Sequence, residues 1–310
     1  MRLLLIVNPA ASSVTPRRRS AVERVLRDGT DLDGARHELE VVETTARGDA
    51  HAFAEKATRD DVEVVVVLAG DGTLNEAANG LAASPTALAA LPGGSTNVFA
   101  RTLGVAYDPV VAAEQVLSSL ERKALRRVGL GAATPPGAST RRFLFHLGLG
   151  FDAAVIGRME RRPAVKRYAA HLAFAAIAFD TWLRRYDRNQ EIRVETVASG
   201  PYAVISNSTP YTYIGRRRLT LTPDAALDRG LAATVFTNLH ASLLLRATAS
   251  GATRARFVTH SAAIVQRADI DHLTISADRP FSWQVDGDCL GEVSHLDVTY
   301  EPDALTLVVP

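Results

Sequence analysis

Short apolar runs alternate with longer amphipathic segments along the first 127 or so residues. Buried strands are predicted for the apolar runs 3–7, 39–42, 62–68 and 87–91. Helices are predicted for the amphipathic segments 18–26, 49–57 and 108–120. The run 62–68 is almost continuous in β-branched residues, which is typical of a strand covered on both faces. This alternation predicts an α/β domain with a doubly wound, mostly parallel sheet.

The pattern changes near residue 127. Short and often alternating strands are predicted for 143–147, 202–206, 219–222, 232–236, 257–263, 273–276 and 281–285. One long helix is predicted from 158 to 186, and a last strand from 305 to 309. We therefore expect a first domain of residues 1–127 and a second domain of residues 128–302, β-rich, antiparallel and sandwich-like.

Composition narrows the class of protein. The 310 residues are 47% hydrophobic and carry a net charge of +1, which argues against a dedicated nucleic-acid binder. The single cysteine, Cys289, rules out an internal disulfide. The N-terminal apolar run is shorter than a signal-peptide core, and no segment approaches the ~20 apolar residues of a membrane span. We expect a cytoplasmic protein with no nucleic-acid partner.

The clearest chemical signal is the motif Gly70-Asp71-Gly72-Thr73, which links a predicted strand to an amphipathic segment. Glycines allow a ligand to approach the backbone, and free N–H groups at the start of a helix bind phosphate. A carboxylate beside phosphates suggests that Asp71 holds Mg²⁺ or accepts a hydroxyl proton. The alternative is an ordinary strand-to-helix turn in which Asp71 caps the helix.

A second loop, 92–97, also follows a predicted strand and also precedes a predicted helix. Asn8 follows the first predicted strand. Since parallel strands end at the same edge of a sheet, all three segments are expected at one ligand-binding edge. The chain contains no Walker-type loop, and no G-x-G-x-x-G follows a strand.

In order along the chain, these motifs resemble the catalytic domain of diacylglycerol and sphingosine kinases. The resemblance rests on Asn8-Pro9, Gly70-Asp71-Gly72-Thr73, Asn75-Glu76, Asn79-Gly80, the loop 92–101, the segment 148–152 and Val285-Asp286-Gly287-Asp288. It implies a lipid kinase of phospholipid biosynthesis that transfers the γ-phosphate of ATP to the hydroxyl of diacylglycerol or a related lipid alcohol. It further implies that the first domain is the nucleotide-binding catalytic domain and that the second holds the lipid substrate, with ATP in a cleft between them. A last strand, about 303–310, is expected to return to the first domain.

The resemblance also implies site residues. Contacts with ATP are expected for Asn8, Thr44, Ala69, Gly70, Asp71, Gly72, Thr73, Leu74, Asn75, Gly94, Ser95 and Asn97. Asp71 is expected near the Mg²⁺ of the nucleotide, and either Asp71 or Asp288 is expected to be the general base. A structural Mg²⁺ is implied near Ala226 and Leu231, although Arg229, which cannot ligate a cation, stands between them. Ala69 and Asp288 depart from the family's usual glycine and glutamate.

Basic residues gather along the predicted long helix. They are Arg158, Arg161, Arg162, Lys166, Arg167, Arg184, Arg185 and Arg188. They form either a solvated face or a surface that draws the protein to anionic lipid, so that it is peripherally membrane-associated. His146, in an apolar run, is interpreted as a core residue, and the sequence leaves a homodimer open.

Two other functions remain open at this point. One is an NAD kinase-like soluble kinase, since that family's phosphate loop also contains Gly-Asp-Gly-Thr. The other is a non-catalytic nucleotide- and lipid-binding protein, in which Ala69, Arg229 and Asp288 would mark the loss of activity.

Overall fold

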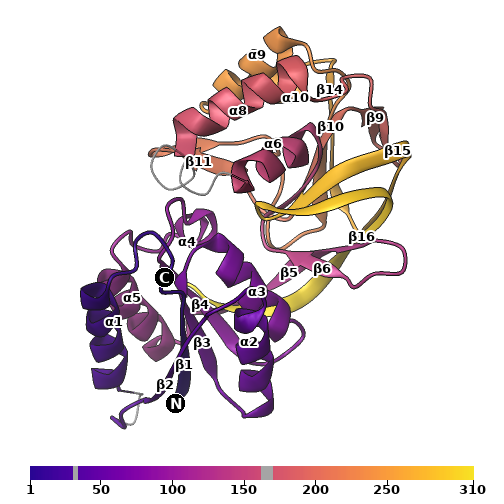
Figure 1. Ribbon diagram of the computed structural model, residues 1–310. Coiled ribbons are helices and arrows are strands. Elements are labelled where there is room, and N and C mark those ends of the chain that lie inside the picture. The colour runs from indigo at the N-terminus through magenta and orange to yellow at the C-terminus, as the bar shows by residue number, and fades with distance from the viewer. Residues whose placement is uncertain (31–33, 162–169) are drawn as a thin grey trace. The chain divides into compact units, whose positions relative to one another are not determined.

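The computed structural model describes residues 1–30, 34–161 and 170–310 (Figure 1). The chain divides into two compact units. Unit 1 comprises Met1–Val128 and Asp303–Pro310, and unit 2 comprises Gly129–Pro302. No helix among these described residues is long and apolar enough to cross a membrane.

Unit 1 is built on a parallel sheet. Its strands are β1 (Arg2–Val7), β2 (Glu38–Glu43), β3 (Val64–Ala69), β4 (Ala87–Pro92) and the end of β16 (Asp288–Val308). They lie in the order β16-β4-β3-β1-β2, and each neighbouring pair is parallel. β5 (Leu125–Thr134) pairs with β16 beside this path. Every residue of β3 is buried, which explains the unbroken apolar run in the sequence.

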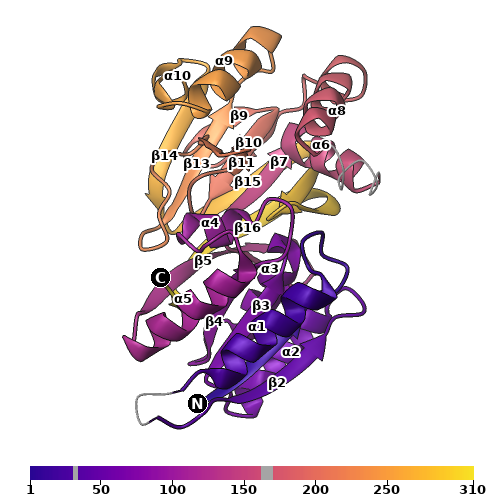
Figure 2. The same cartoon turned by 90° about the vertical axis from the view of Figure 1, so that its left-hand side faces the viewer.

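Helices cover both faces of this sheet. They are α1 (Pro16–Asp28), α2 (Asp49–Arg59), α3 (Asp71–Leu81), α4 (Val98–Thr102) and α5 (Pro109–Glu121). α1 packs beside α5 on one face, and α2 packs beside α3 on the other (Figures 1 and 2). Thr15 and Asp108 cap α1 and α5, each followed by a proline in the first turn. The prediction of a doubly wound α/β domain is confirmed.

Unit 2 is antiparallel and rich in strands. They are β6 (Arg141–Phe143), β7 (His146–Gly150), β8 (Ile192–Val194), β9 (Ala198–Gly200), β10 (Tyr202–Ser206), β11 (Thr212–Ile214), β12 (Arg217–Leu219), β13 (Leu231–Phe236), β14 (Ile264–Ile270) and β15 (His272–Val285). The main sheet has the order β14-β13-β10-β7-β15-β16, with antiparallel pairs throughout. The predicted β-rich antiparallel region is therefore confirmed.

The helices of unit 2 pack on one face of its sheet. They are α6 (Phe151–Glu160), α8 (Ala170–Arg184), α9 (Ala241–Gly251) and α10 (Arg256–His260). Alternate residues of β10 serve two cores: Tyr202 and Val204 pack against these helices, while Ala203 and Ile205 join the apolar cluster on the other face. The period of two along a strand thus divides the apolar residues between two layers.

Several predicted elements differ from the structure. The strand predicted at 257–263 is wrong, because residues 256–260 form α10, with Phe257 under the Arg246 guanidinium of α9 at 4.2 Å. The strand predicted at 143–147 is broken between β6 and β7, since the side chain of Asp286 takes the amides of residues 144–146. The strands predicted at 273–276 and 281–285 are one strand, β15, with a shifted register between them.

The long helix predicted from 158 to 186 also differs. α6 begins earlier, at Phe151, and ends at Glu160, and α8 covers Ala170–Arg184. Gly150, at φ +68, makes the turn that starts α6 and thus separates it from β7. Residues 162–169 lie outside the described part of the chain, and with them Arg162, Lys166 and Arg167.

Candidate phosphate-binding site and catalytic turn

Three loops meet at the carboxyl edge of the sheet in unit 1. Backbone hydrogen bonds hold them: the Asn8 amide donates to the Leu68 carbonyl at 3.2 Å, and the Gly93 amide to the Ala69 carbonyl at 2.8 Å. The Ser13 amide donates to the Gly93 carbonyl, also at 2.8 Å. The segments that follow β1, β3 and β4 are therefore fixed relative to one another.

Glycines allow the loops after β3 and β4 to approach closely. A Cβ atom on Gly94 would lie 2.8 Å from the Gly70 Cα, and one on Gly93 would lie 2.8 Å from the Ala69 Cα. Real Cβ atoms do not come so near to backbone. Ala69 itself is extended at the end of β3, opposite Pro92, so an alanine fits where the family usually has glycine.

Asp71 links these two loops. It is the first residue of α3, and Gly70 is the N-cap of that helix. Its Oδ2 accepts the Val98 amide at 2.9 Å and its Oδ1 accepts the Phe99 amide at 3.1 Å, so its carboxylate caps the neighbouring helix α4. Burial of the carboxylate raises the pKa of Asp71, while the two amides and the charge of Arg101 oppose the rise.

Two asparagine side chains also hold the loops. Asn8 Nδ2 donates to Thr73 Oγ1 at 3.0 Å, and its Oδ1 accepts the Ala10 amide at 3.0 Å. Asn97, at φ +49, accepts the Gly94 amide at 2.7 Å and donates back to the Gly94 carbonyl at 2.8 Å. Both side chains therefore shape the backbone that a phosphate would meet.

The remaining expected ATP contacts divide into two groups. Ser95 is exposed on its loop, and the Thr44 amide bonds to the Val7 carbonyl at 2.9 Å, so both lie at the carboxyl edge. Leu74 and Asn75 are buried within α3. The Asn75 amide oxygen accepts Asn79 Nδ2 at 3.1 Å.

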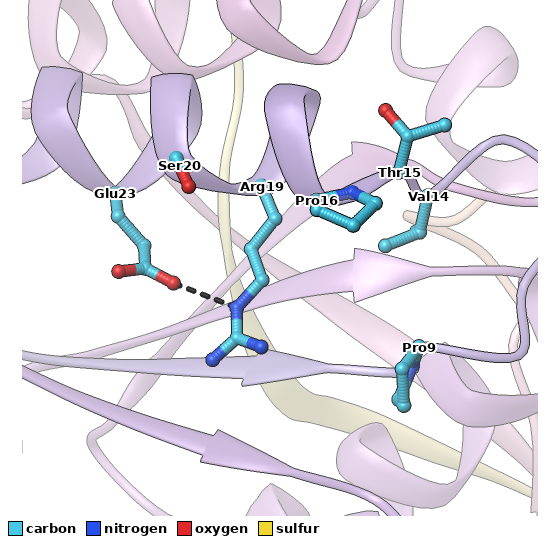
Figure 3. Close-up of a pocket in the computed structure, with 7 residues that line it drawn as sticks. All are labelled: Pro9, Val14, Thr15, Pro16, Arg19, Ser20 and Glu23. Carbon is cyan, nitrogen blue, oxygen red and sulfur yellow. Dashed lines mark hydrogen bonds and ion pairs between the residues drawn. The ribbon is translucent and has the colours of Figure 1, made fainter.

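A cavity of about 380 Å³ lies beside the loop after β1. It is lined by Pro9, Val14, Thr15, Pro16, Arg19, Ser20 and Glu23 (Figure 3). Arg19 Nε bonds to Glu23 at 2.7 Å, and the guanidinium also contacts Glu43, so two carboxylates already hold this cation. The sequence did not predict this cavity. Its volume is typical of a small-molecule site.

In unit 2, the turn between β15 and β16 contains Asp286, Gly287 and Asp288. Asp286 is buried, with φ +49, and its carboxylate accepts the amides of Leu144, Phe145 and His146 at 2.7, 3.0 and 2.9 Å. Gly287 has φ +88, which favours glycine. Asp288 begins β16 and is half-buried. The two aspartates of this turn thus differ: Asp286 is buried and holds the backbone, and Asp288 is partly exposed to solvent.

The apolar neighbourhood of His146 agrees with its interpretation as a core residue. Its ring lies 4.4 Å from that of Tyr211, and its Nδ1 is buried without a hydrogen-bond partner. Burial lowers the pKa of His146 to about 3.

Comparison with known proteins identifies unit 1. Residues 2–128 match the diacylglycerol kinase catalytic domain. Unit 1 belongs to that family. The diacylglycerol kinase of Staphylococcus carnosus (strain TM300) is 22% identical over 282 residues, covering 87% of each chain. That of Bacillus subtilis (strain 168) is 37% identical over 95 residues, which cover 29% of this chain and 31% of that protein.

The fold is shared over the whole length. The crystal structure of a diacylglycerol kinase from Bacillus anthracis str. Sterne superposes with a TM-score of 0.67 at 19% identity. The superposition covers 100% of this chain and 97% of that one. Both the α/β unit and the antiparallel unit are therefore those of a diacylglycerol kinase-like fold.

The residues expected around a structural Mg²⁺ lie in the turn before β13 and at the start of that strand. The Ala226 carbonyl accepts the Arg229 amide at 3.3 Å, and Leu231 is fully buried in β13, opposite Ile270. In the described ranges, no three His, Cys, Asp or Glu side chains are grouped so that they could hold a metal ion. The arrangement of unit 1 fits phosphate through backbone amides.

Proposed function

We propose that this chain is an ATP-dependent lipid kinase that phosphorylates the hydroxyl of diacylglycerol or a related lipid alcohol. One observation carries the proposal: the carboxylate of Asp71 joins the loop after β3 to the loop after β4. The family match of residues 2–128 and the whole-length similarity to diacylglycerol kinases support the same reaction class.

In this proposal the backbone of unit 1 binds the phosphates of ATP. The N-terminus of α3, at Gly70 and Asp71, offers amides and the positive end of the helix dipole. The tight Gly70–Gly94 approach keeps this backbone rigid, so it needs little reorganisation when phosphate binds. Mg²⁺, arriving with the nucleotide, would supply further neutralisation of phosphate charge.

The reaction needs an acceptor for one proton. The lipid oxygen forms a bond to the γ-phosphorus, the bond from the γ-phosphorus to the ADP oxygen breaks, and the hydroxyl proton passes to a carboxylate. We assign that carboxylate to Asp288. Asp288 is half-buried at the start of β16, and it stands where the resembled family has its glutamate.

The lipid substrate also implies contact with a membrane surface. α8 exposes Phe179 and Leu183, at 62% and 48%, next to the exposed cations Arg184 and Arg185. Apolar and basic side chains together are the composition of peripheral membrane helices. We therefore propose a cytoplasmic enzyme that binds the bilayer reversibly through α8. Arg158 is not part of this surface, since it pairs with Asp180 and Thr181.

The proposal is tested by phosphate transfer from γ-labelled ATP. The acceptors are diacylglycerol, sphingosine and a fatty alcohol in detergent micelles, and NAD in solution. We expect label in diacylglycerol or another lipid alcohol and none in NAD. Label in NAD alone would establish the soluble-kinase alternative. ATP binding without transfer to any acceptor would establish the non-catalytic one.

Asp288 is tested by two substitutions. Asp288→Ala should lower lipid phosphorylation at least ~10²-fold while ATP still binds, because the proton acceptor is lost. Asp288→Glu should keep substantial turnover, since it restores a carboxylate one methylene longer. Full turnover by Asp288→Ala would remove Asp288 from the mechanism.

A further inference from the structure

A chain of buried polar side chains ends beneath the turn that contains Asp288. The Tyr211 hydroxyl donates to Asp152 Oδ1, and Gln284 Nε2 donates to Asp152 Oδ2 at 2.8 Å. Gln284 Oε1 then accepts the Gly287 amide at 2.7 Å. Asp152 is 4% exposed and Gln284 is fully buried, so both exchanged water for these protein partners.

The surrounding backbone leaves space for this chain. A Cβ atom on Gly148 would overlap both Asp152 Oδ2 and Gln284 Nε2. Asp152 lies in the first turn of α6, where the helix dipole stabilises a carboxylate. Burial nonetheless raises the pKa of Asp152 to about 6, which shows that this position is costly for a charge.

The hydrogen bonds between Asp152, Gln284 and Gly287 allow only one assignment of donors and acceptors. The Gly287 amide can only donate, so Gln284 must turn its oxygen toward it and its NH₂ toward residue 152. Residue 152 must then accept from Gln284 and from the Tyr211 hydroxyl at once. A carboxylate does this without a donor of its own, so Asp152 fixes the orientation of the Gln284 amide.

The turn is also held from its other side. The Asp286 carboxylate takes three amides, and the Asp286 amide donates to the His146 carbonyl at 2.9 Å. The Cys289 amide approaches Glu160 Oε1 of α6 at 3.4 Å. The residues before and after Asp288 are therefore both fixed by unit 2.

We infer that Asp152 and Gln284 are positioning residues, which orient the Gly287 peptide so that Asp288 is aimed at the hydroxyl it deprotonates. The inference rests on the proposed function, because it assigns Asp288 the proton. A proton acceptor must lie within ~2.6–3.2 Å of the hydroxyl, so a small rotation of this turn is costly in rate. The competing interpretation is that the chain only stabilises unit 2.

Kinetics of Gln284→Met separate these interpretations. The methionine keeps the length of the side chain but loses both hydrogen bonds of the amide. We expect kcat to fall at least tenfold with the KM for ATP unchanged. The matched control is Gln266→Met: Gln266 is a part-buried amide that donates to Thr234 Oγ1 at 2.9 Å and to the Leu221 carbonyl at 3.0 Å. It should lose stability and keep kcat.

A double-mutant cycle provides the decisive readout. If Gln284 acts through Asp288, Gln284→Met should change the residual single-turnover rate of Asp288→Ala less than twofold. Gln284→Glu, whose introduced carboxyl can share a proton with Asp152 and still accept from Gly287, should retain more activity than Gln284→Met. It also provides a folded variant if the methionine is not tolerated.

The failures are distinguishable. Full kcat in folded Gln284→Met, or equal losses from that substitution with and without Asp288, would overturn the inference alone. Full turnover by Asp288→Ala would overturn the role of Asp288 and the inference with it. Transfer to no lipid by the wild-type chain would overturn the proposed function.

Discussion

Carboxylates that accept backbone amides recur at helix starts in this chain, and they differ in how many oxygens they use. Asp71 uses both oxygens, one for Val98 and one for Phe99. Asp108, the N-cap of α5, accepts the amides of Val110 and Val111 with Oδ1 alone. An asparagine side chain has one acceptor oxygen. It can therefore replace Asp108, which uses one oxygen, but not Asp71, which uses two.

The substitution Asp71→Asn should therefore reduce both stability and activity. One amide of α4 would face an NH₂ group, which should lower the free energy of unfolding by about 1–3 kcal/mol. Turnover should fall at least ~10²-fold, because the two loops lose one of the hydrogen bonds that join them. Thermal unfolding and lipid phosphorylation measure the two effects. The control Asp108→Asn should leave both near wild type. An Asp71→Asn enzyme with wild-type turnover would show that the charge of Asp71 is dispensable.

The buried His146 and Asp152 give unit 2 opposing responses to acid. The pKa of His146 falls from 6.5 to about 3 in the folded state, so stability is lost as the pH drops below 6.5 and the unfolded chain takes up a proton. The pKa of Asp152 rises from 3.8 to about 6, so the folded state takes up that proton first and stability is gained between pH 6 and pH 4.

When the pH is lowered from 7.5 to 5, protonation of His146 in the unfolded chain should lower the free energy of unfolding by about 2 kcal/mol. Protonation of Asp152 in the folded chain should raise it by about 1 kcal/mol. Urea unfolding at the two pH values measures the difference. His146→Phe should reduce the loss on acidification, and Asp152→Asn should increase it. The same acid response in all three proteins would mean that neither group keeps its shifted pKa in solution.

At the scale of elements, α8 departs from the surface expected of a helix in water, because it exposes two large apolar side chains. Phe179 and Leu183 are four residues apart and lie on one face. Arg188 covers the Trp182 ring at 5.2 Å, so part of the basic charge is held close to this face. Exposed apolar side chains next to cations favour binding to an anionic bilayer surface.

We expect two double variants to bind phosphatidylserine vesicles at least tenfold more weakly. One carries Phe179→Ser and Leu183→Ser, and the other carries Arg184→Glu and Arg185→Glu. Each basic residue near such a surface contributes ~1 kcal/mol. Sedimentation with vesicles measures this, and ATP binding should be unchanged. Leu245→Ser is the control, because Leu245 is 72% exposed on α9. An equal loss in the control would place the membrane contact elsewhere.

The elements of unit 1 were predictable from sequence because their signals are local. β1, β3 and β4 begin and end within two residues of the predicted runs, since each run is apolar on both faces and ends at a glycine, proline or asparagine. The Gly-Asp-Gly and Pro-Gly-Gly motifs likewise marked the loops that the structure joins.

Unit 2 was less predictable because distant residues decide its elements. The break between β6 and β7 depends on Asp286, more than 130 residues later in the chain. α10 forms where Phe257 and Val258 looked like a strand, because Val258 packs into the helical core. Asp152 stood in the motif 148–152, but nothing in the sequence placed Gln284 beside it, as neither residue type predicts burial.

At the scale of the whole molecule, unit 2 is inserted into unit 1, and the last eight residues complete the sheet of the first unit. Thr306 and Leu307 pair with Ala87 and Leu88 of β4, and Leu305, Leu307 and Val308 are buried. The Val309 amide adds a hydrogen bond to the Ala124 carbonyl at 3.1 Å. The C-terminal segment is therefore a structural strand of unit 1.

Removal of residues 303–310 should unfold unit 1 or leave it unable to bind ATP. Leu307→Ala should cost about 2–5 kcal/mol, as for other buried leucines. Thermal unfolding and nucleotide binding of the shortened chain measure the effect. Deletion of Pro310 alone, which is exposed, is the control and should be neutral. A shortened chain with normal ATP affinity would show that β4 tolerates an open edge.

This insertion has a consequence for synthesis on the ribosome. Residues 1–128 emerge before unit 2, yet the strand that covers β4 is translated only after unit 2. While unit 2 is translated, the edge of β4 at Ala87 and Leu88 remains unpaired. Unpaired edges of this kind recruit other nascent strands. Chaperone dependence and aggregation in the cell should therefore follow the time needed to translate unit 2, so that codon changes confined to residues 129–302 would alter the yield of a folded unit 1.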